Sequence, residues 1–266
     1  MEYRILGPVG IGDGNREIPV DGVKLRTVLA ALLLSGGRVT SDGQMSDLLW
    51  GQRPPATSSA QIWTYISRLR KLLGQGATIV RRTPGYLLDI GQEGAFDYAE
   101  FEADAERGRT AAAAGSHDEA SACLRAALMR WRGPALSNVS EHLFTAEAGR
   151  LEEAKATAAE DLMDADLMLG RYAQILPELT RLVRQYPLRE RFRAQSMVVL
   201  YRLDRQAEAL ALFDEGRRKL AEELGIDPGG LLRGVHQAIL AGAGELPWPA
   251  RDHRQIRWSS SAAILS

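Results

Sequence analysis

The sequence predicts a mostly α-helical protein in which a small α+β part precedes a larger all-α part. Short strand-like segments and helical segments alternate over the first ninety residues. After Gly94 nearly every segment has helical periodicity. Within the second part, Arg171-Tyr172-Ala173 and Arg205-Gln206-Ala207 begin similar segments 34 positions apart, which is the period of tetratricopeptide-type helical hairpins.

Composition excludes several classes of protein. The chain has 266 residues, of which 45% are hydrophobic and 25% charged, close to the globular average and enough for about two domains. The longest apolar run, Val28 to Leu34, is much shorter than the roughly 20 residues of a membrane span. The first residues lack a signal-peptide pattern, and the single cysteine excludes an intrachain disulfide. We therefore expect a cytoplasmic protein.

The near-zero net charge conceals an asymmetry along the chain. Residues 1–92 carry 11 Lys and Arg against 7 Asp and Glu, whereas the remainder carries 22 against 27. A basic head on an acidic body is typical of a nucleic-acid-binding part joined to a protein-binding part. A random scatter of surface charge gives the same totals, so the asymmetry alone does not decide the function.

The order of elements in the head predicts a winged helix-turn-helix over residues 1–92. Glycines, prolines and hydroxyl caps separate the segments. Thr40 or Ser41 caps the second helix, and Ser58 or Ser59 opens the third. The expected elements are strands at 3–5 and 17–20 on either side of a turn at 12–15, helices at 24–34, from 41 to Gly51 and from 58 to 73, and a hairpin at 79–82 and 87–89.

The third helix carries the candidate site. Its apolar residues form one seam, and its basic residues lie on the opposite face. A helix fits the major groove of DNA, where an arginine bonds guanine bidentately and a threonine methyl contacts thymine. We expect Arg68 to be the principal base reader. The other expected DNA contacts are Trp63, Thr64, Ser67, Arg70 and Lys71 on the helix, and Arg81 and Arg82 on the hairpin.

A solvated helix face is the plain alternative for these basic residues. Three exposed Arg or Lys side chains on one helix favour that alternative when they are taken alone. The hairpin with two further arginines that follows directly favours DNA binding, with Arg70, Lys71, Arg81 and Arg82 on phosphates. Trp50 is expected to pack in the core or at its edge rather than to contact DNA.

The second part predicts a tetratricopeptide-like helical repeat domain over residues 95–243, followed by a tail at 244–266. Asp97 with Glu100 forms a capping-box-like start. A long apolar stripe from Leu151 to Leu169 and the 34-residue repeat follow. Trp248 in the tail could dock on the helical domain, as could Trp258.

No catalytic constellation is recognisable in the sequence. The four histidines are scattered, and no glycine-rich stretch has the context of a phosphate-binding loop. Cys123 lies among alanines and leucines on a helix, so we expect a buried structural thiol. We therefore predict no enzyme activity, no cofactor and no metal.

The motifs as a set resemble one family of regulators. Leu48-Leu49-Trp50-Gly51, Tyr65 to Leu73 and Pro84-Gly85-Tyr86 are similar to the OmpR-type DNA-binding domain of the Streptomyces antibiotic regulatory protein (SARP) family. Further motifs resemble the bacterial transcriptional activator domain of that family: Trp131-Arg132-Gly133, Pro187 to Glu190, Arg205 to Leu210 and Leu224 to Pro228. Leu203-Asp204 departs from the family, which commonly has a small residue and glycine there.

This resemblance implies a transcriptional activator of a secondary-metabolite gene cluster. Such proteins bind direct repeats in double-stranded DNA near the −35 element, as a side-by-side pair, and recruit RNA polymerase holoenzyme through its sigma and alpha subunits. It implies a protein of the cytoplasm associated with the nucleoid, with no membrane partner. Two alternatives stay open: an interaction scaffold built on the helical repeats, and a repressor that uses the same DNA-binding head.

Overall fold

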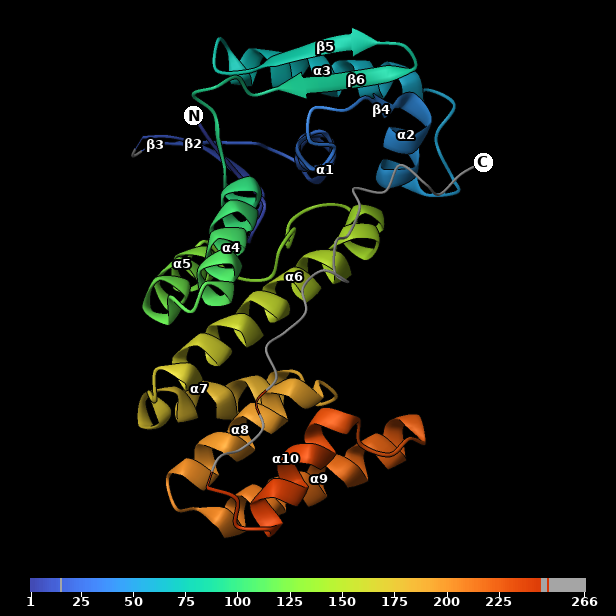
Figure 1. Ribbon diagram of the computed structural model, residues 1–266. Coiled ribbons are helices and arrows are strands. Elements are labelled where there is room, and N and C mark those ends of the chain that lie inside the picture. The colour runs from blue at the N-terminus through green and yellow to red at the C-terminus, as the bar shows by residue number, and fades with distance from the viewer. Residues whose placement is uncertain (15, 245–247, 249–266) are drawn as a thin grey trace. The chain divides into compact units, whose positions relative to one another are not determined.

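The computed structural model describes residues 1–14, 16–244 and 248, which form two compact units (Figure 1). The first unit comprises residues 1–112 and 118–162, and the second comprises residues 113–117 and those from 163 onward. The boundary between them lies inside one long helix, α6 (Glu141–Met168). Each unit has its own buried core.

The first unit begins with a small sheet in the order β3-β2-β1-β7. The pairs are antiparallel except for β1 with β7, which is parallel. The two strands expected before and after the turn are confirmed as β1 and β3. The strand between them, β2, is not predicted by the sequence because its glycines disfavour a strand. The bounds are β1 (Glu2–Arg4), β2 (Gly10–Asp13), β3 (Arg16–Ile18) and β7 (Ala95–Phe96).

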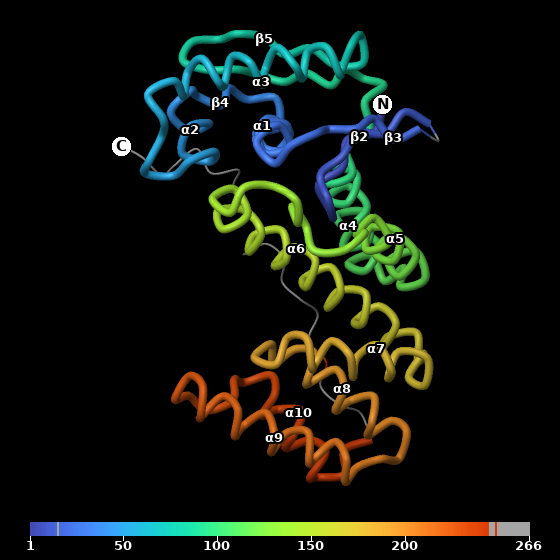
Figure 2. The backbone as a smooth tube through the Cα atoms, turned by 180° about the vertical axis from the view of Figure 1, so that it is seen from behind, coloured from blue at the N-terminus to red at the C-terminus, as the bar shows by residue number. Residues whose placement is uncertain are grey.

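Three helices and a second sheet complete the predicted winged helix-turn-helix. Figure 1 shows α3 alongside the hairpin of β5 and β6, and in Figure 2 α1 is seen end-on beneath α3. The helices are α1 (Val23–Leu34), α2 (Asp42–Trp50) and α3 (Ser58–Leu73). The antiparallel sheet has the order β4-β6-β5, formed by β4 (Thr40–Ser41), β6 (Gly85–Asp89) and β5 (Thr78–Arg82).

Two sequence signals explain how this sheet joins the helices. The Ser41 hydroxyl accepts the backbone N–H of Gln44 (3.1 Å) and the Gln44 side chain accepts that of Ser41 (3.0 Å), so the expected cap of α2 is confirmed as a capping box. Gly85 pairs with Ser41, and a Cβ on Gly85 would lie 1.8 Å from the carbonyl oxygen of Thr40. Only glycine lets β4 and β6 approach this closely.

The remaining helices of the first unit depart from the sequence expectations in two details. Helix α4 starts at Asp97 as predicted, but Asp97 and Glu100 do not form the expected capping box with each other. The Asp97 carboxylate instead accepts the backbone N–H groups of Ile5 and Leu6, and Glu100 binds Arg130. The expectation of a buried Cys123 is wrong, because Cys123 is half-buried beside the buried seam of its helix. The helices are α4 (Asp97–Ala113), α5 (His117–Met129) and the first part of α6.

The second unit consists of two helical hairpins, as the 34-residue repeat predicts. Ile175 and its equivalent Ala209 are both buried, as are Leu179 and its equivalent Phe213. The central helix α8 packs against α7, α9 and α10 (Figure 2). The helices are α7 (Tyr172–Gln185), α8 (Glu190–Arg202), α9 (Gln206–Leu224) and α10 (Gly230–Leu240).

The departure from the family pattern at Asp204 has a structural consequence. Asp204 has φ +60, a left-handed conformation, in the turn between α8 and α9, and the equivalent Gly170 has φ +69. This conformation costs a residue with a Cβ about 1–2 kcal/mol, and glycine loses roughly 0.5–1 kcal/mol of that advantage to chain entropy.

We therefore expect Asp204→Gly to stabilise the second unit by about 0.5 kcal/mol, measured by urea unfolding followed by circular dichroism. Asp214→Gly, in the interior of α9, is the matched control and is expected to destabilise by roughly 0.1–0.3 kcal/mol, because Asp is itself a poor helix former. A loss of stability in Asp204→Gly would contradict the strain argument.

Candidate nucleic-acid interface

Helix α3 has one buried face and one exposed face. Ile62, Ile66, Leu69 and Leu73 are all buried, and α3 packs through them against α1, α2 and β5. The burial of this seam, as the sequence predicts, turns the opposite face of the helix to solvent. The apolar seam thus fixes the orientation of α3, and the basic residues on its other face stay outside the core.

Two cations of the exposed face are free to bind a ligand. Arg68 and Lys71 are exposed, and neither has a hydrogen-bond or ion-pair partner among the residues that the structure describes. They lie three residues apart and so face the same side of the helix. An unpaired guanidinium keeps all its donors for an acceptor outside the protein.

The uncharged residues of this face complete it. Trp63 is 61% exposed, an unusual state for so large an apolar side chain. The Thr64 hydroxyl donates to the carbonyl of Ala60 at 2.9 Å, so its hydrogen is used within the helix and its methyl group remains available. Ser67 is half-buried.

Arg70 connects α3 to the hairpin. Its Nε and Nη2 atoms donate to the carbonyl oxygen of Ile79 on β5, at 3.0 and 2.7 Å. These two bonds fix the hairpin at one position along the helix. Arg70, which the sequence predicts to bind phosphate, is therefore a positioning residue in this structure, although its side chain is still exposed.

The two hairpin arginines differ from each other. Arg81 binds Asp42 through two 2.7 Å bonds and lies 4.6 Å from the centre of the Tyr86 ring. The hydrogen bonds that Arg81 donates to the Asp42 carboxylate raise the pKa of the Arg81 guanidinium above its ordinary value. Arg82 is exposed, and the described part of the chain supplies it with no partner. Of the two, Arg82 is the cation that is free to bind a phosphate.

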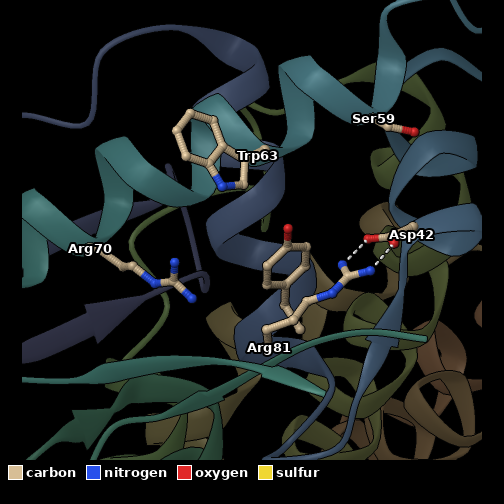
Figure 3. A pocket seen from close by; sticks show the side chains of 6 residues that line it. Asp42, Ser59, Trp63, Arg70 and Arg81 are labelled. Carbon is tan, nitrogen blue, oxygen red and sulfur yellow. Dashed lines mark hydrogen bonds and ion pairs between the residues drawn. The ribbon is translucent and has the colours of Figure 1, made fainter. Parts of the chain in front are cut away.

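A hollow of about 400 Å³ lies between α3, the start of α2 and the hairpin. Figure 3 shows the Trp63 ring at its edge and the Arg81–Asp42 pair across from Arg70. Three of its lining residues, Asp42, Ser59 and Tyr86, are not among the DNA contacts that the sequence predicts. The sequence signals for two of them are that Asp42 follows the capping serine and that Tyr86 ends the Pro-Gly-Tyr motif. The lining residues are Asp42, Ser59, Trp63, Arg70, Arg81 and Tyr86.

Trp50 lies outside this interface. The Lys24 ammonium nitrogen lies 4.7 Å from the centre of the Trp50 ring and also donates to the carbonyl of Leu49. Burial lowers the pKa of the Lys24 ammonium. The indole therefore packs at the junction of α1 and α2, as expected from the sequence.

The described residues contain neither a cluster of metal ligands nor a membrane-spanning helix. Within that part of the chain, no three His, Cys, Asp or Glu side chains gather closely enough to hold a metal ion. Over the same residues, no helix combines the length and apolarity that crossing a bilayer requires.

Family models match both parts of the chain. Residues 96–240 match the model of the bacterial transcriptional activator domain, and residues 22–88, from α1 to β6, match that of the transcriptional regulatory protein C-terminal domain. DnrI from Streptomyces peucetius, a regulatory protein, is 38% identical over 251 residues, which cover 90% of this chain and 92% of DnrI. The chain belongs to the SARP family of transcriptional regulators.

Two longer proteins are similar to this chain over part of their length. The regulatory protein AfsR from Streptomyces griseus is 40% identical over 95% of this chain, which spans only 26% of AfsR. A solved structure of Mycobacterium tuberculosis EmbR, in complex with a low-affinity phosphopeptide, superimposes with a TM-score of 0.87 at 34% identity, over 94% of this chain and 66% of EmbR. The predicted family and mostly helical fold class are thus confirmed.

Proposed function

We propose that this SARP-family protein is a sequence-specific transcriptional activator that binds double-stranded DNA and controls a secondary-metabolite (antibiotic) gene cluster. The observation that carries the proposal is the exposed face of α3, where Arg68 and Lys71 have no partner in the described protein. A helix with free cations beside an arginine-bearing hairpin suits the major groove and the flanking phosphates.

Each candidate residue has a distinct role in this proposal. Arg68 bonds a guanine edge, with Trp63, Thr64 and Ser67 contacting neighbouring bases or sugars. Lys71 and Arg82 neutralise phosphates. Arg70 and Arg81 hold the hairpin against α3 and α2 and contact the DNA backbone through the donors left over from Ile79 and Asp42.

The rest of the chain acts through proteins. We assign residues 1–92 to DNA binding and residues 95–243 to recruitment of RNA polymerase holoenzyme through its sigma and alpha subunits, with 244–266 as a tail. Two copies bind side by side on direct repeats near the −35 element. The protein acts without catalysis or cofactor in the cytoplasm, at the nucleoid.

The first experiment is a selection of genomic fragments by the purified wild-type protein and by Arg68→Ala in moderate salt, followed by sequencing. We expect the wild type alone to enrich direct repeats. Enrichment by neither protein would contradict DNA binding and favour the scaffold alternative. Run-off transcription from a selected promoter with polymerase holoenzyme should then rise when the protein is added; a fall would instead indicate a repressor.

Lys71→Ala should weaken binding to all DNA sequences to a similar extent. Because Lys71 is assigned to one phosphate, the slope of log affinity against log salt should become shallower by about 0.9. The measurement is a salt titration of binding by fluorescence anisotropy. Arg184→Ala, which removes the same charge from an exposed residue of α7, should leave the slope unchanged, and equal slopes in all three proteins would refute the assignment.

A further inference from the structure

The chain that leaves α10 returns to α8. The Tyr201 hydroxyl donates to the carbonyl oxygen of Ala243 at 3.1 Å, and the Arg202 guanidinium donates to that of Gly244 at 2.8 Å. Both donors lie at the C-terminal end of α8. Two side chains of α8 thus bind the backbone of the segment that follows α10.

Trp248 contacts residues near the other end of α8. Its indole Nε1 donates to the Oδ1 atom of Asp164 at 3.1 Å, and the guanidinium carbon of Arg191 lies 5.3 Å from the centre of its ring. Asp164 lies near the end of α6 and Arg191 in the first turn of α8. The indole is therefore held both by a hydrogen bond and by a cation–π contact.

The acceptor of this hydrogen bond is fixed by the helices. The Asp164 carboxylate also accepts the Arg191 Nε–H at 3.1 Å and the Gln195 amide at 2.6 Å. The Asp164 and Arg191 side chains are only 18% and 14% exposed, and Gln195 is fully buried. A carboxylate that two neighbours orient in this way is preorganised to accept a third donor.

This chemistry distinguishes an indole from other apolar side chains. Phenylalanine has a π-face for Arg191 but no N–H for Asp164, and an aliphatic side chain has neither. A side chain that only covered the helices would not need a directed donor. We call Asp164, Arg191 and Gln195 the indole site.

We propose that the indole site is a binding site for a tryptophan side chain, filled in cis by Trp248 and open to a tryptophan-bearing segment of a partner protein only after Trp248 leaves. Because Gly244 is held on α8 and Trp248 follows it by only four residues, the effective concentration of Trp248 is on the order of millimolar or higher. The occupant is nevertheless a single half-buried side chain, which a tighter ligand displaces. The proposal does not depend on DNA binding.

The cis contact is tested on the full chain through its indole N–H signals in ¹H–¹⁵N spectra. Trp248→Phe identifies the Trp248 signal among the five tryptophans. We expect its exchange with water to be at least tenfold slower than that of free tryptophan, and to return to the free rate in Asp164→Ala. Trp63→Phe, at an exposed tryptophan of α3, is the matched control and should leave the protection intact. A free exchange rate in the wild type would overturn the proposal.

The site itself is tested with a labelled peptide of the sequence of residues 243–250. The Trp248→Ala chain, which lacks the competing indole, should bind the peptide saturably, and the wild-type chain at least tenfold more weakly. A peptide with phenylalanine in place of tryptophan should also bind at least tenfold more weakly to the Trp248→Ala chain. Equal affinity of the two chains, or no binding by Trp248→Ala, would show that no such site exists.

Discussion

Arg68→Ala is expected to weaken binding to the selected operator by about 1–3 kcal/mol, roughly 5- to 150-fold, and to relax the preference at one base pair. The reason is that Arg68 is exposed on α3 with no protein partner in the described structure, so its donors are available to a guanine edge. The measurement is anisotropy with the operator and with its single-base variants. Unchanged affinity and unchanged base preference would disprove the role of Arg68.

Two further variants separate base reading from simple charge. Arg68→Lys keeps the charge but loses the bidentate geometry, so binding to random DNA should persist while discrimination at that base pair falls. Arg184→Ala removes one positive charge from an exposed position of α7 and should leave both the affinity for random DNA and the discrimination at that base pair unchanged. Equal discrimination by Arg68→Lys and the wild type would point to a phosphate contact instead.

The sequence was sufficient to predict which face of α3 is exposed. Helical periodicity fixes the seam from Ile62 to Leu73, and the basic residues follow on the other side. The capping serine of α2 was equally predictable because its partner, Gln44, lies three residues away. Both signals depend on residues within one or two helical turns of each other, so the local sequence is enough to predict the buried face and the cap.

Contacts across the fold were not predictable in the same way. Arg70 and Arg81 carry the same charge as Arg68, yet their donors are bound to Ile79 and Asp42. Sequence patterns identify cations, but only the packing of α2 and β5 against α3 decides which of them find acceptors. The strand β2 was missed for a related reason: pairing with β1 and β3 overrides the low strand propensity of its glycines.

Asp97→Ala is expected to destabilise the first unit by about 4 kcal/mol. The Asp97 carboxylate accepts the backbone N–H groups of Ile5 and Leu6 at 3.0 and 3.1 Å and the Arg132 guanidinium at 2.7 Å. Ile5 and Leu6 are completely buried, so their N–H groups would lose an acceptor that water does not replace, at roughly 1–3 kcal/mol each. Urea unfolding followed by circular dichroism measures the change.

Burial raises the pKa of the Asp97 carboxyl, while the bonds from Ile5, Leu6 and Arg132 act in the opposite direction. The carboxylate is therefore costly to bury, and its three donors offset that cost. Asp97→Asn removes the charge but keeps one oxygen acceptor, so its expected loss is about half that of alanine. Asp89→Ala is the control: among the described residues that exposed carboxylate accepts only the N–H of Gly91, so the change in stability should be less than about 1 kcal/mol.

Native-state hydrogen exchange distinguishes this local mechanism from a general loss of packing. In Asp97→Ala the N–H groups of Ile5 and Leu6 should exchange faster than the fall in global stability accounts for, because their acceptor is gone even in the folded state. Amides in the centre of α1 should follow global stability alone. If the amides of Ile5 and Leu6 instead follow those of α1, the carboxylate does not hold the end of β1 against α4.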